Sequence, residues 1–404
     1  MNILMLLYKD IPYDARVKRE ALALAEAGHS VYLACVREFP EPDPFLHKNI
    51  HLKRLPISVK SMKAAMSGAN SGQTPKRSGL KRAVVRAARL PLVKILKDYM
   101  AYYEFYKKVK SKVGDLKIDA VHCHDLNTLW QGSMLAKDFS AKLIYDAHEI
   151  FNEMAGRNGL DRFTGYKMEK HLFQKIDRLV TVNLYLRDYL FERNGEKPCV
   201  LIQNIPLFSE DMLAGNKAID WNYTFGEDDT VLLYQGGFSP YRGLDLIVKT
   251  VAELPESFKL VMIGSGILKE ELKSLAESLG VSDRVFFHDQ VPSEDLFYYT
   301  QKADIGLVMY EKVSKNNYYS TPNKMFEYLQ AGVPAVSSNH PGKSVVIDEY
   351  KTGVLAEETT EGIKAGIMEV KNNYEYYRQN CLQARSVLTW EAESRKLAEM
   401  YENL

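Results

Sequence analysis

The sequence predicts an α/β protein of two domains, each built on a doubly wound parallel sheet. The chain has 404 residues, and short apolar stretches alternate with longer amphipathic ones from end to end. This alternation runs through five or six units in the first half of the chain and again in the second. A single hydrophobic core stops growing at roughly 250–300 residues, so this length predicts two domains. Nearly continuous apolar strands joined by helices are typical of parallel sheets that helices cover on both faces.

Eleven apolar stretches predict strands. Six lie in the first half, at residues 2–8, 30–36, 119–124, 142–148, 178–183 and 199–204. Five lie in the second half, at residues 230–236, 259–264, 284–288, 305–310 and 334–338. Between them, amphipathic stretches predict helices at residues 14–27, 163–175, 244–254, 267–279 and 322–331.

A polar stretch without periodicity, residues 203–229, is the expected domain boundary. We predict an N-terminal Rossmann-like domain over residues 1–205 and a C-terminal one over residues 206–385. The last residues, 386–404, have an amphipathic pattern that predicts a further helix.

The composition is that of a soluble globular protein, with 46% hydrophobic residues and a net charge of +1. The four cysteines are scattered and form no C-x-x-C pair, which argues against a structural zinc site or disulfides and fits a reducing cytoplasm. The apolar run at the start is short and has no positive residues before it, so we expect a buried strand and not a signal peptide. A cytoplasmic location is therefore expected.

Residues 60–112 hold 14 lysines and arginines but only two acidic residues. Part of this charge clusters on one helical face, at Arg82, Arg86, Arg89 and Lys97. Basic amphipathic segments bind anionic membrane surfaces, so we expect a peripheral contact with the inner face of the cell membrane. The alternative is a solvated surface. A nucleic-acid partner is not expected, because the total charge is near zero and the basic core lacks interleaved aromatic residues.

Loops after the predicted second-half strands carry glycines and an arginine. In open parallel sheets, ligands bind beyond the carboxyl ends of the strands. Glycine allows a backbone to approach a ligand closely, and a guanidinium fits phosphate oxygens. We therefore predict that the ligand is contacted by Gly236, Gly237, Arg242, Gly264 and Gly266. Tight turns and a surface arginine are the alternative. No G-x-G-x-x-G follows the first strand, which argues against a nicotinamide or flavin cofactor.

The stretch STPNKMFEYLQAGVPAVSS, residues 320–338, has a crowded polar start. Thr321 is the predicted N-cap and Pro322 the first helical residue. A helix start favours anions such as a diphosphate, and Lys324 in the first turn is sensible if an anion binds there. Glu327 can accept hydrogen bonds from a ribose or sugar diol. The alternative is an exposed Lys324–Glu327 pair worth about 0.3 kcal/mol.

Two first-half strands end in histidines and acids. His122, His124 and Asp125 end one strand, and His148 and Glu149 follow the next. No third and fourth ligand stand at a recognisable spacing, so no metal is predicted. We expect hydrogen bonds to a substrate, with structural histidines as the alternative.

The first predicted helix begins with a further polar group. Asp14 fits as its N-cap. The sequence leaves open whether Arg16 and Lys18 face a ligand or solvent.

In this order, these stretches resemble the retaining glycosyltransferases of family four, which have the GT-B fold. PNKMFEYLQAGVPAV looks like the branch that makes bacterial surface polysaccharides. YQGGFSPYRGLDLIV, LVMIGSGILKEELKSLA and VPSEDLFYYTQKADIGLVMY match the other donor-domain signatures, and YDARVKREALALAEAGHSV, AVHCHDLNTL and LIYDAHEIF match the acceptor half. The resemblance covers nearly the whole chain.

The resemblance implies transfer of a sugar from a nucleoside diphosphate donor with retained anomeric configuration. Arg242 and Lys324 would bind the diphosphate, helped by backbone N–H groups at Gly237 and Thr321. The other donor-side roles would fall to Glu327 for the ribose, Val291 for the base, and His124 with Asp125 for the reacting sugar. Acceptor-side candidates are Asp14, Arg16, His148 and Glu149. The last helix would cross back to the N-terminal domain.

The sequence departs from the family pattern in two places. Tyr319 stands where the first acid of the usual Glu-x7-Glu pair is expected, so Asn323 or Asn317 would take over contacts with the sugar. Gly237 stands where the usual arginine is expected and Arg242 replaces the usual lysine, so Lys324 would supply the missing charge.

The expected partners are a nucleotide sugar, UDP-linked rather than GDP-linked, and a saccharide acceptor carried on a lipid. No D-x-D motif is present, so we expect activity without a metal or other cofactor. Two alternatives remain. One is an epimerase or hydrolase that needs no acceptor, and the other is a non-catalytic subunit that binds sugar nucleotides.

Overall fold

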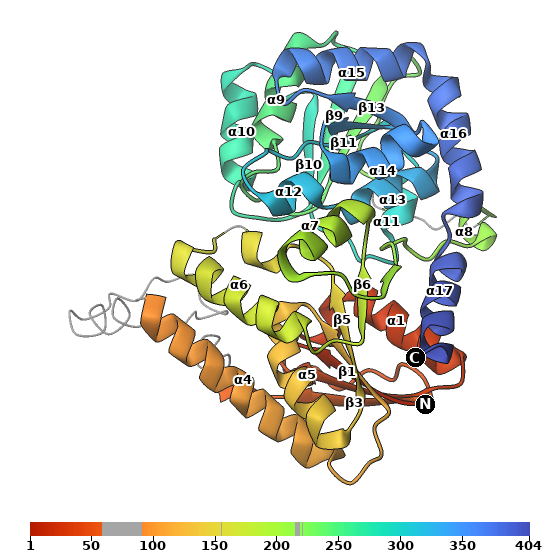
Figure 1. Ribbon diagram of the computed structural model, residues 1–404. Coiled ribbons are helices and arrows are strands. Elements are labelled where there is room, and N and C mark those ends of the chain that lie inside the picture. Colours follow the sequence, from red (N-terminus) through yellow and green to blue (C-terminus); the bar gives the residue numbers. More distant parts are fainter. Residues whose placement is uncertain (59–90, 155, 215–218, 220) are drawn as a thin grey trace. The chain divides into compact units, whose positions relative to one another are not determined.

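The computed structural model describes residues 1–58, 91–154, 156–214, 219 and 221–404 (Figure 1). These residues form two compact units. The first contains Met1–Ile202 and Ser394–Leu404, and the second contains Gln203–Glu393. Residues 59–90, with three of the four clustered basic residues named above, lie outside the described ranges.

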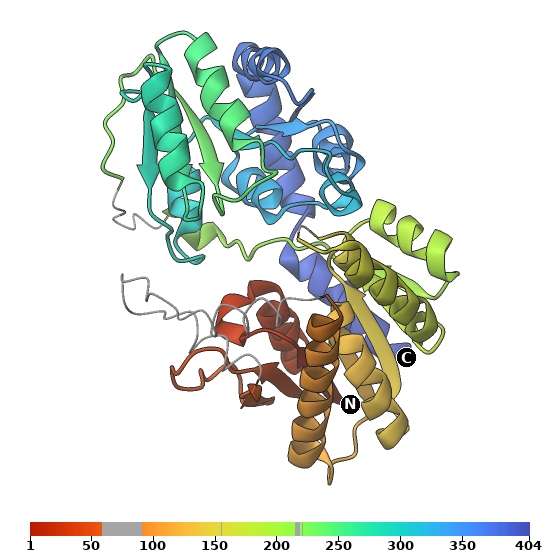
Figure 2. The ribbon, with the colours of Figure 1, turned by 90° about the vertical axis from the view of Figure 1, so that its left-hand side faces the viewer.

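The first unit has a seven-stranded sheet in the order β3-β2-β1-β4-β5-β6-β7, and all neighbours are parallel. The strands are β1 (Asn2–Leu7), β2 (Ser30–Val36), β3 (Ile50–Leu55), β4 (Ala120–His124), β5 (Lys142–Ala147), β6 (Arg178–Thr181) and β7 (Cys199–Leu201). The helices are η1 (Ile11–Tyr13), α1 (Ala15–Glu26), α4 (Pro91–Val113), α5 (Leu126–Phe139), η2 (Phe151–Glu153), α6 (Gly159–Phe173) and α7 (Leu184–Asn194). Helices α4, α5 and α6 contact one another on one side of this sheet (Figure 2).

The second unit has a six-stranded parallel sheet in the order β10-β9-β8-β11-β12-β13. The strands are β8 (Thr230–Gln235), β9 (Phe258–Ile263), β10 (Val285–His288), β11 (Ile305–Val308), β12 (Ala335–Ser338) and β13 (Gly353–Ala356). The helices are α8 (Glu210–Ala214), α9 (Leu244–Glu253), α10 (Lys269–Ser278), α11 (Leu296–Thr300), α12 (Lys315–Tyr319), α13 (Asn323–Ala331), α14 (Pro341–Tyr350), α15 (Thr360–Asn372) and α16 (Tyr374–Val387).

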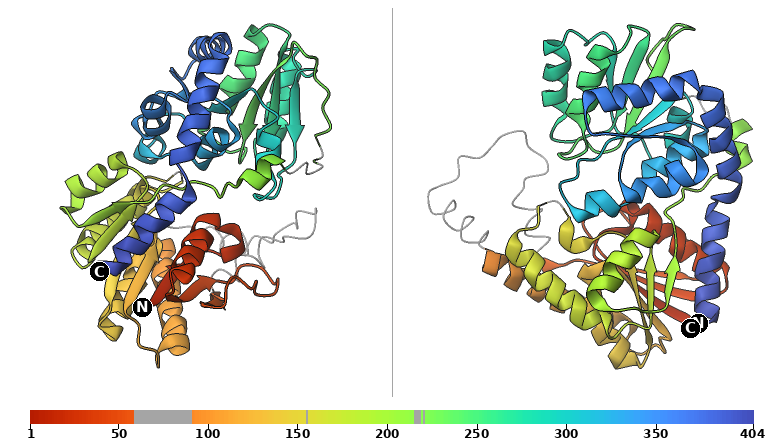
Figure 3. Two further views of the ribbon diagram at one scale, coloured as in Figure 1. Left: turned by 90° about the vertical axis from the view of Figure 1, so that its right-hand side faces the viewer. Right: turned by 45° about the horizontal axis from the view of Figure 1, so that its top comes forward.

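The last helix, α17 (Trp390–Glu402), begins in the second unit and ends in the first. Its end lies beside the N-terminus of the chain (Figure 3), where the ring centres of Tyr401 and His29 are 5.7 Å apart.

Each strand of the second sheet divides its side chains between two cores. Leu232 and Tyr234 of β8 pack with α9, α10 and α15, whereas Val231 and Leu233 pack with α13 and α14. This alternation buries both faces of the sheet, as a run of consecutive apolar residues requires. Two Rossmann-like units of this kind confirm the predicted fold class.

All eleven predicted strands are present, and two edge strands were not predicted. β3 has the sequence IHLKRL and β13 only GVLA. Among the described residues, no helix is both long and apolar enough to span a bilayer.

Candidate functional site

Polar side chains gather at the carboxyl ends of the central strands in each unit. In the second unit they come from the loops after β8, β9 and β11 and from the start of α13. In the first unit they come from the ends of β4 and β5.

The loops after β8 and β9 interlock through glycines. A Cβ atom at Gly264 would lie 1.9 Å from the Gly236 carbonyl oxygen, and one at Gly266 would lie 2.3 Å from the Phe238 carbonyl oxygen. Both glycines also have positive φ angles, 153° and 156°. Their missing side chains thus make room for the neighbouring loop. A Cβ atom at Gly237 would meet nothing closer than 3.9 Å, so this exposed backbone is open to a ligand.

Arg242 lies in the loop after β8 and turns toward β11. Its Nη1 donates to the Tyr310 hydroxyl over 3.2 Å, and its guanidinium carbon is 5.5 Å from the centre of the Tyr310 ring. The residues on either side, Tyr241 and Gly243, have φ angles of 66° and 60°. A Cβ at Gly243 would lie 2.9 Å from the Met309 Cβ, so this position needs glycine. The backbone therefore fixes where the arginine points.

Lys324 in the first turn of α13 is buried, with 5% exposure. Its Nζ has no hydrogen-bond partner and lies 3.8 Å from the centre of the Tyr234 ring. Burial, and then the Arg242 guanidinium, hold the pKa of Lys324 well below its usual value. The alternative of an exposed surface pair with Glu327 is therefore wrong. An ammonium without a partner beside a second cation is a site prepared for an anion.

Glu327 lies one turn further along α13 and is half-buried. Gln235, the last residue of β8, donates its side-chain amide to Glu327 Oε2, and its own Oε1 accepts from Thr300 Oγ1 over 2.9 Å. This chain of hydrogen bonds fixes the carboxylate at the edge of the sheet. A fixed carboxylate can accept two hydroxyl groups of a diol.

The start of α13 differs from the prediction. The helix begins at Asn323 with Pro322 as N-cap and no side-chain cap, so the assignment of Thr321 as N-cap was wrong. The Thr321 hydroxyl donates instead to the Gly342 carbonyl oxygen over 2.6 Å, which draws it toward α14. Since no side chain caps the first turn, its N–H groups add to the positive field around Lys324.

The two asparagines considered for the sugar are held by other protein groups. Asn317 donates to the carbonyl oxygens of Tyr241 and Glu311, over 3.2 and 3.0 Å. Asn323 is exposed, and its side-chain oxygen accepts from Asn204 over 2.6 Å. Val291, the expected base contact, is half-buried after β10 and packs against the core below α13.

Sequence reasoning missed Lys343 in α14, which is fully buried. Its Nζ donates to the Asn317 carbonyl oxygen and lies 4.9 Å from the centre of the Tyr310 ring. Burial lowers the pKa of Lys343 to about 7. Tyr310 thus has three basic side chains around it, Lys343, Arg242 and Lys324. In the sequence, a lysine in the first turn of a helix gave no sign that it would turn inward.

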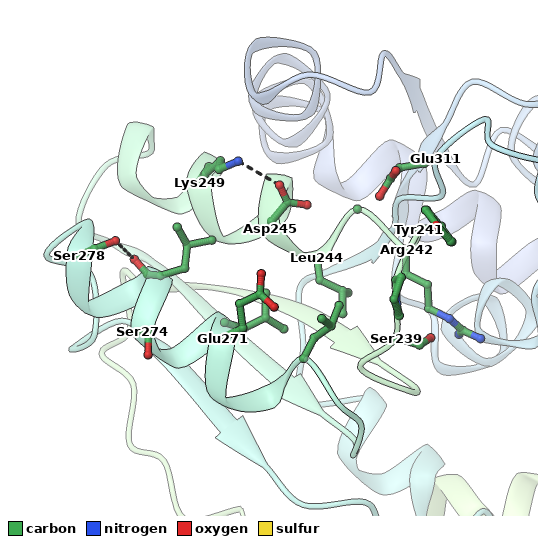
Figure 4. Close-up of a pocket in the computed structure, with 15 residues that line it drawn as sticks. Ser239, Tyr241, Arg242, Leu244, Asp245, Lys249, Glu271, Ser274, Ser278 and Glu311 are labelled. Carbon is green, nitrogen blue, oxygen red and sulfur yellow. Dashed lines mark hydrogen bonds and ion pairs between the residues drawn. The ribbon is translucent and has the colours of Figure 1, made fainter. Parts of the chain in front are cut away.

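A cavity of about 520 Å³ lies elsewhere, between α9, α10 and the loop after β8 (Figure 4). Asp245, Glu271 and Glu311 contribute to its lining, and the Arg242 guanidinium points away from them. Lys249 also lines the cavity, but the three carboxylates make it less suited to a diphosphate than the surroundings of Lys324.

In the first unit, Asp125 follows β4 with an unusual backbone conformation, φ 64° and ψ 165°. Few residues other than glycine adopt these angles, which cost on the order of 1–3 kcal/mol and concentrate at functional sites. The side chain is 28% exposed and accepts from the His148 backbone N–H over 3.3 Å. Burial raises the pKa of Asp125 to about 6.

His148 follows β5 and is bound to an internal carboxylate. Its Nε2 lies 2.8 Å from Asp146 Oδ2, and its side chain is 14% exposed. Although burial opposes the charged form, the Asp146 carboxylate raises the pKa of His148 to about 9. Glu149 beside it is half-buried.

Two of the other first-unit candidates, His124 and Arg16, do not reach the surface. His124 is fully buried, its ring stacks on His122 at 4.6 Å, and burial lowers its pKa to about 3. Arg16 is buried and lies 2.9 Å from Glu20 and 3.2 Å from Asp146. Asp14 caps α1 by accepting from the Val17 N–H over 3.1 Å, as predicted. Asp125, His148 and the half-buried Glu149 are therefore the candidates that this edge offers to a ligand.

Two family profiles match the chain. The family described as "Glycosyl transferases group 1" matches residues 216–386, and the one described as "Glycosyl transferase 4-like domain" matches residues 13–204. Between them they account for most of both units.

Curated relatives are distant. An uncharacterized glycosyltransferase of Methanocaldococcus jannaschii is 23% identical over 61% of this chain and 65% of its own length. The chain thus spans less than two thirds of that relative. The putative teichuronic acid biosynthesis glycosyltransferase TuaH of Bacillus subtilis is 25% identical over 52% of this chain and 53% of its own length.

Solved structures align over the whole chain. Sucrose-phosphate synthase from Thermosynechococcus elongatus has a TM-score of 0.75 at 18% identity, covering 100% of this chain and 99% of the other. Anabaena Alr3699/HepE, solved in complex with UDP, has a TM-score of 0.69 at 12% identity, covering 100% of both chains. At such identities the likeness shows the fold alone, which is GT-B.

Proposed function

Since the chain belongs to the glycosyltransferases that combine a group 1 domain with a 4-like domain, we propose that it transfers a sugar from a nucleoside diphosphate donor to a saccharide acceptor, with retention of anomeric configuration. The second unit would bind the donor. The observation that carries this proposal is the buried Lys324 ammonium without a hydrogen-bond partner.

The diphosphate would lie at the start of α13. Lys324 and Arg242 would contact its oxygens, and the exposed Gly237 backbone and the uncapped first turn would donate N–H groups to it. Burying an ammonium without a partner costs free energy, which an arriving diphosphate would recover. The site is thus arranged for a doubly charged ligand.

The nucleoside would lie along α13 and the loop after β10. Glu327, fixed by Gln235, would accept hydrogen bonds from two ribose hydroxyls. The half-buried Val291 would contact the base. We propose UDP rather than GDP as the nucleotide, in keeping with the UDP complex reported for Anabaena Alr3699/HepE.

The reaction needs little covalent chemistry from the protein. A bond forms between the acceptor oxygen and the anomeric carbon while the bond from that carbon to the diphosphate oxygen breaks on the same face. The acceptor proton passes to the departing diphosphate. Lys324 and Arg242 would stabilise the negative charge that develops on the leaving group. Because these cations and the helix start serve that purpose, we propose that turnover needs no metal on the diphosphate.

On the first unit, Asp125 and His148 would contact the acceptor or the reacting sugar. Both lie at the carboxyl edge of the sheet with some exposure, and the strained backbone of Asp125 supports a functional role for this position. His124, for which the family resemblance implies a direct contact, is buried, so we assign it a supporting place beside Asp146.

We further propose that the acceptor is carried on a lipid and that α4 meets an anionic membrane. Leu96, Tyr99, Met100 and Tyr103 form a stripe on this helix and are 62%, 38%, 61% and 46% exposed. Lysine charge surrounds the stripe, and Lys107 Nζ lies 5.1 Å from the Tyr103 ring centre. An apolar stripe with cationic flanks fits an anionic lipid surface.

Vesicle sedimentation tests this surface. Binding of wild type should be stronger to vesicles that contain phosphatidylglycerol than to phosphatidylcholine alone. The double variant Leu96→Ser/Met100→Ser should bind at least about tenfold more weakly, since it loses two exposed apolar side chains. Ile267→Ser removes an apolar side chain that is 83% exposed in the second unit and is the matched control. Equal sedimentation of all three proteins would contradict the proposal.

Calorimetric titration with UDP, GDP and ADP tests the donor site. Tight binding of one nucleotide, lost in Glu327→Ala, would support the proposal and identify the base. Absence of binding by all three would contradict it. If donor is consumed without an acceptor, the epimerase or hydrolase alternative gains support. Binding without any turnover would favour a sugar-nucleotide-binding subunit.

A further inference from the structure

The first unit contains a group of buried side chains that the proposed donor site does not use. Glu20 from α1, His122 and His124 from β4, and Asp146 from β5 each offer one ligand atom, and these atoms lie within 4.8 Å of one another. All four side chains have no exposed surface. Residues far apart in the sequence are thus brought to one point inside the fold.

The distances fit a bound cation. His122 Nε2 lies 3.5 Å from Asp146 Oδ2 and 3.9 Å from Glu20 Oε2. His124 Nδ1 lies 3.3 and 4.0 Å from the same two oxygens. Four ligands at about 2.0–2.2 Å from a tetrahedral metal are separated by roughly 3.3–3.6 Å from one another. The ligand atoms, which lie within 4.8 Å of one another, would therefore have to contract to close around an ion.

Several of these buried polar atoms have no hydrogen-bond partner. They include His122 Nε2 and Glu20 Oε2, whereas Glu20 Oε1 forms an ion pair with Arg16. Buried polar atoms are nearly always satisfied, and each one left without a partner costs about 1–3 kcal/mol. A cation at the centre would satisfy His122 Nε2 and Glu20 Oε2 together. Two imidazoles and two carboxylates are a ligand set that suits Zn²⁺ and its first-row neighbours.

Groups outside the cluster hold the ligands in orientation. The Tyr401 hydroxyl is 2.6 Å from His122 Nδ1, the ring nitrogen that faces away from the centre. Arg16 lies 2.9 Å from Glu20 Oε1 and 3.2 Å from Asp146 Oδ1. These are the supports that metal ligands usually have. Arg16 balances one of the two carboxylates, and the other needs either a metal ion or a proton nearby.

A proton is the competing occupant. His148 Nε2 lies 2.8 Å from Asp146 Oδ2 and 3.4 Å from His124 Nδ1, so a charged His148 would also balance the cluster. A proton on Glu20 that Asp146 accepts is a second possibility, but either proton would leave His122 Nε2 without a partner. We propose that Glu20, His122, His124 and Asp146 bind a divalent transition-metal ion of the Zn²⁺ type, which ties α1 to β4 and β5. This site is separate from the donor diphosphate, and its role is to hold the strand edge that carries Asp125 and His148.

Metal analysis of the purified full chain is the direct test. After incubation with Zn²⁺ and removal of unbound ion, we expect about one zinc per chain. Replacement by Co²⁺ should give the visible absorption of a tetrahedral cobalt site. Removal of the ion by a chelator should lower the melting temperature and leave the affinity for UDP unchanged, which separates this proposal from that of the donor site.

Two variants and a control keep the test decisive. Glu20→Gln keeps the shape of the side chain, and His122→Ala removes one ligand. Each should weaken zinc binding by more than the roughly 10–100-fold that loss of a group supporting a ligand causes, with circular dichroism confirming a folded chain. His171→Ala alters an exposed histidine of α6 and should bind zinc as wild type does. The proposal is overturned if wild type retains neither zinc nor cobalt, or if Glu20→Gln binds zinc as tightly as wild type.

Discussion

Replacement of Lys324 by methionine should have opposite effects on stability and on ligand binding. Lys324→Met keeps the length and much of the shape of the side chain but removes the ammonium. The wild-type Nζ is buried, has no hydrogen-bond partner and lies 3.8 Å from the centre of the Tyr234 ring. Without a ligand the protein carries the cost of this buried group, and with a diphosphate it gains a strong contact.

The two effects have comparable sizes. A buried polar group without a partner costs about 1–3 kcal/mol, so the free energy of unfolding of the variant without ligand should rise by that amount. For a unit of 150–250 residues this corresponds to about 2–4 °C in melting temperature per kcal/mol. Loss of a hydrogen bond to a charged phosphate oxygen costs about 1.5–3 kcal/mol, so the Kd for UDP should rise by about 10–150-fold.

Thermal melting with and without UDP, together with calorimetry, measures both effects. Because burial, and then the Arg242 guanidinium, lower the pKa of Lys324 and a bound diphosphate would raise it, any proton uptake on UDP binding should be smaller in the variant than in wild type. Lys249→Met is the matched control. Its ammonium is 45% exposed and pairs with Asp245 at 2.9 Å on α9, so it should change neither quantity by more than about 0.5 kcal/mol. A Lys324→Met protein that is less stable than wild type, or that binds UDP equally well, would refute the reasoning.

Three further results are expected. Glu327→Gln should weaken UDP binding by about tenfold or more, because the carboxylate contacts the ribose diol. The affinity for 2′-deoxy-UDP should be the same in the variant and in wild type. An equal loss of affinity for both nucleotides would mean that Glu327 does not contact the ribose. Burial lowers the pKa of Lys343 to about 7 in the folded chain. Above that pH the folded chain has released a proton that the unfolded chain still holds. Stability to urea should therefore rise as the pH rises from about 7 toward the usual lysine pKa of about 10.4, and Lys343→Met should flatten this rise; an unchanged slope would argue against the buried charge. Asp125→Asn should slow transfer by about 10²-fold or more while UDP affinity stays unchanged, because Asp125 belongs to the first unit; a variant with normal turnover would remove Asp125 from the active site.

Most strands of the two sheets were predictable because a run of consecutive apolar residues indicates a strand that is buried on both faces. β1 reads NILMLL and β8 reads TVLLYQ, and both are buried almost throughout. β3 was missed because IHLKRL alternates polar and apolar residues at the edge of its sheet. β13 was missed because four residues, one of them glycine, give too short a pattern. A Cβ at Gly353 would lie 1.9 Å from the Ala335 carbonyl oxygen, so close strand packing explains this glycine.

The residue types of the donor site were predictable, but their contacts were not. Sequence placed Lys324 and Glu327 on one helix, since their spacing puts them one turn apart. It misplaced the N-cap, because Thr321 has the right chemistry for a cap while its hydroxyl is taken by Gly342. It missed Lys343, whose burial depends on how α14 packs against the loop that carries Asn317. Contacts between elements that are far apart in the sequence produce no local sequence pattern.

The same limit applies to the first unit. His122 and His124 were recognised as a pair on one strand, and metal binding was set aside for want of further ligands. Glu20 and Asp146 lie beside them only in the folded chain. The sequence also gave no sign that His124 is buried while Asp125 and His148 keep some exposure.

Release of UDP from UDP-sugar donors, followed with and without a lipid extract from the membranes of the producing cells, tests the central claim most directly. We predict UDP release that depends on the extract and is lost in Lys324→Met, with an α-linked product from an α-linked donor by nuclear magnetic resonance. Donor binding without release on any extract, or a product of inverted configuration, would contradict the assignment as a retaining glycosyltransferase.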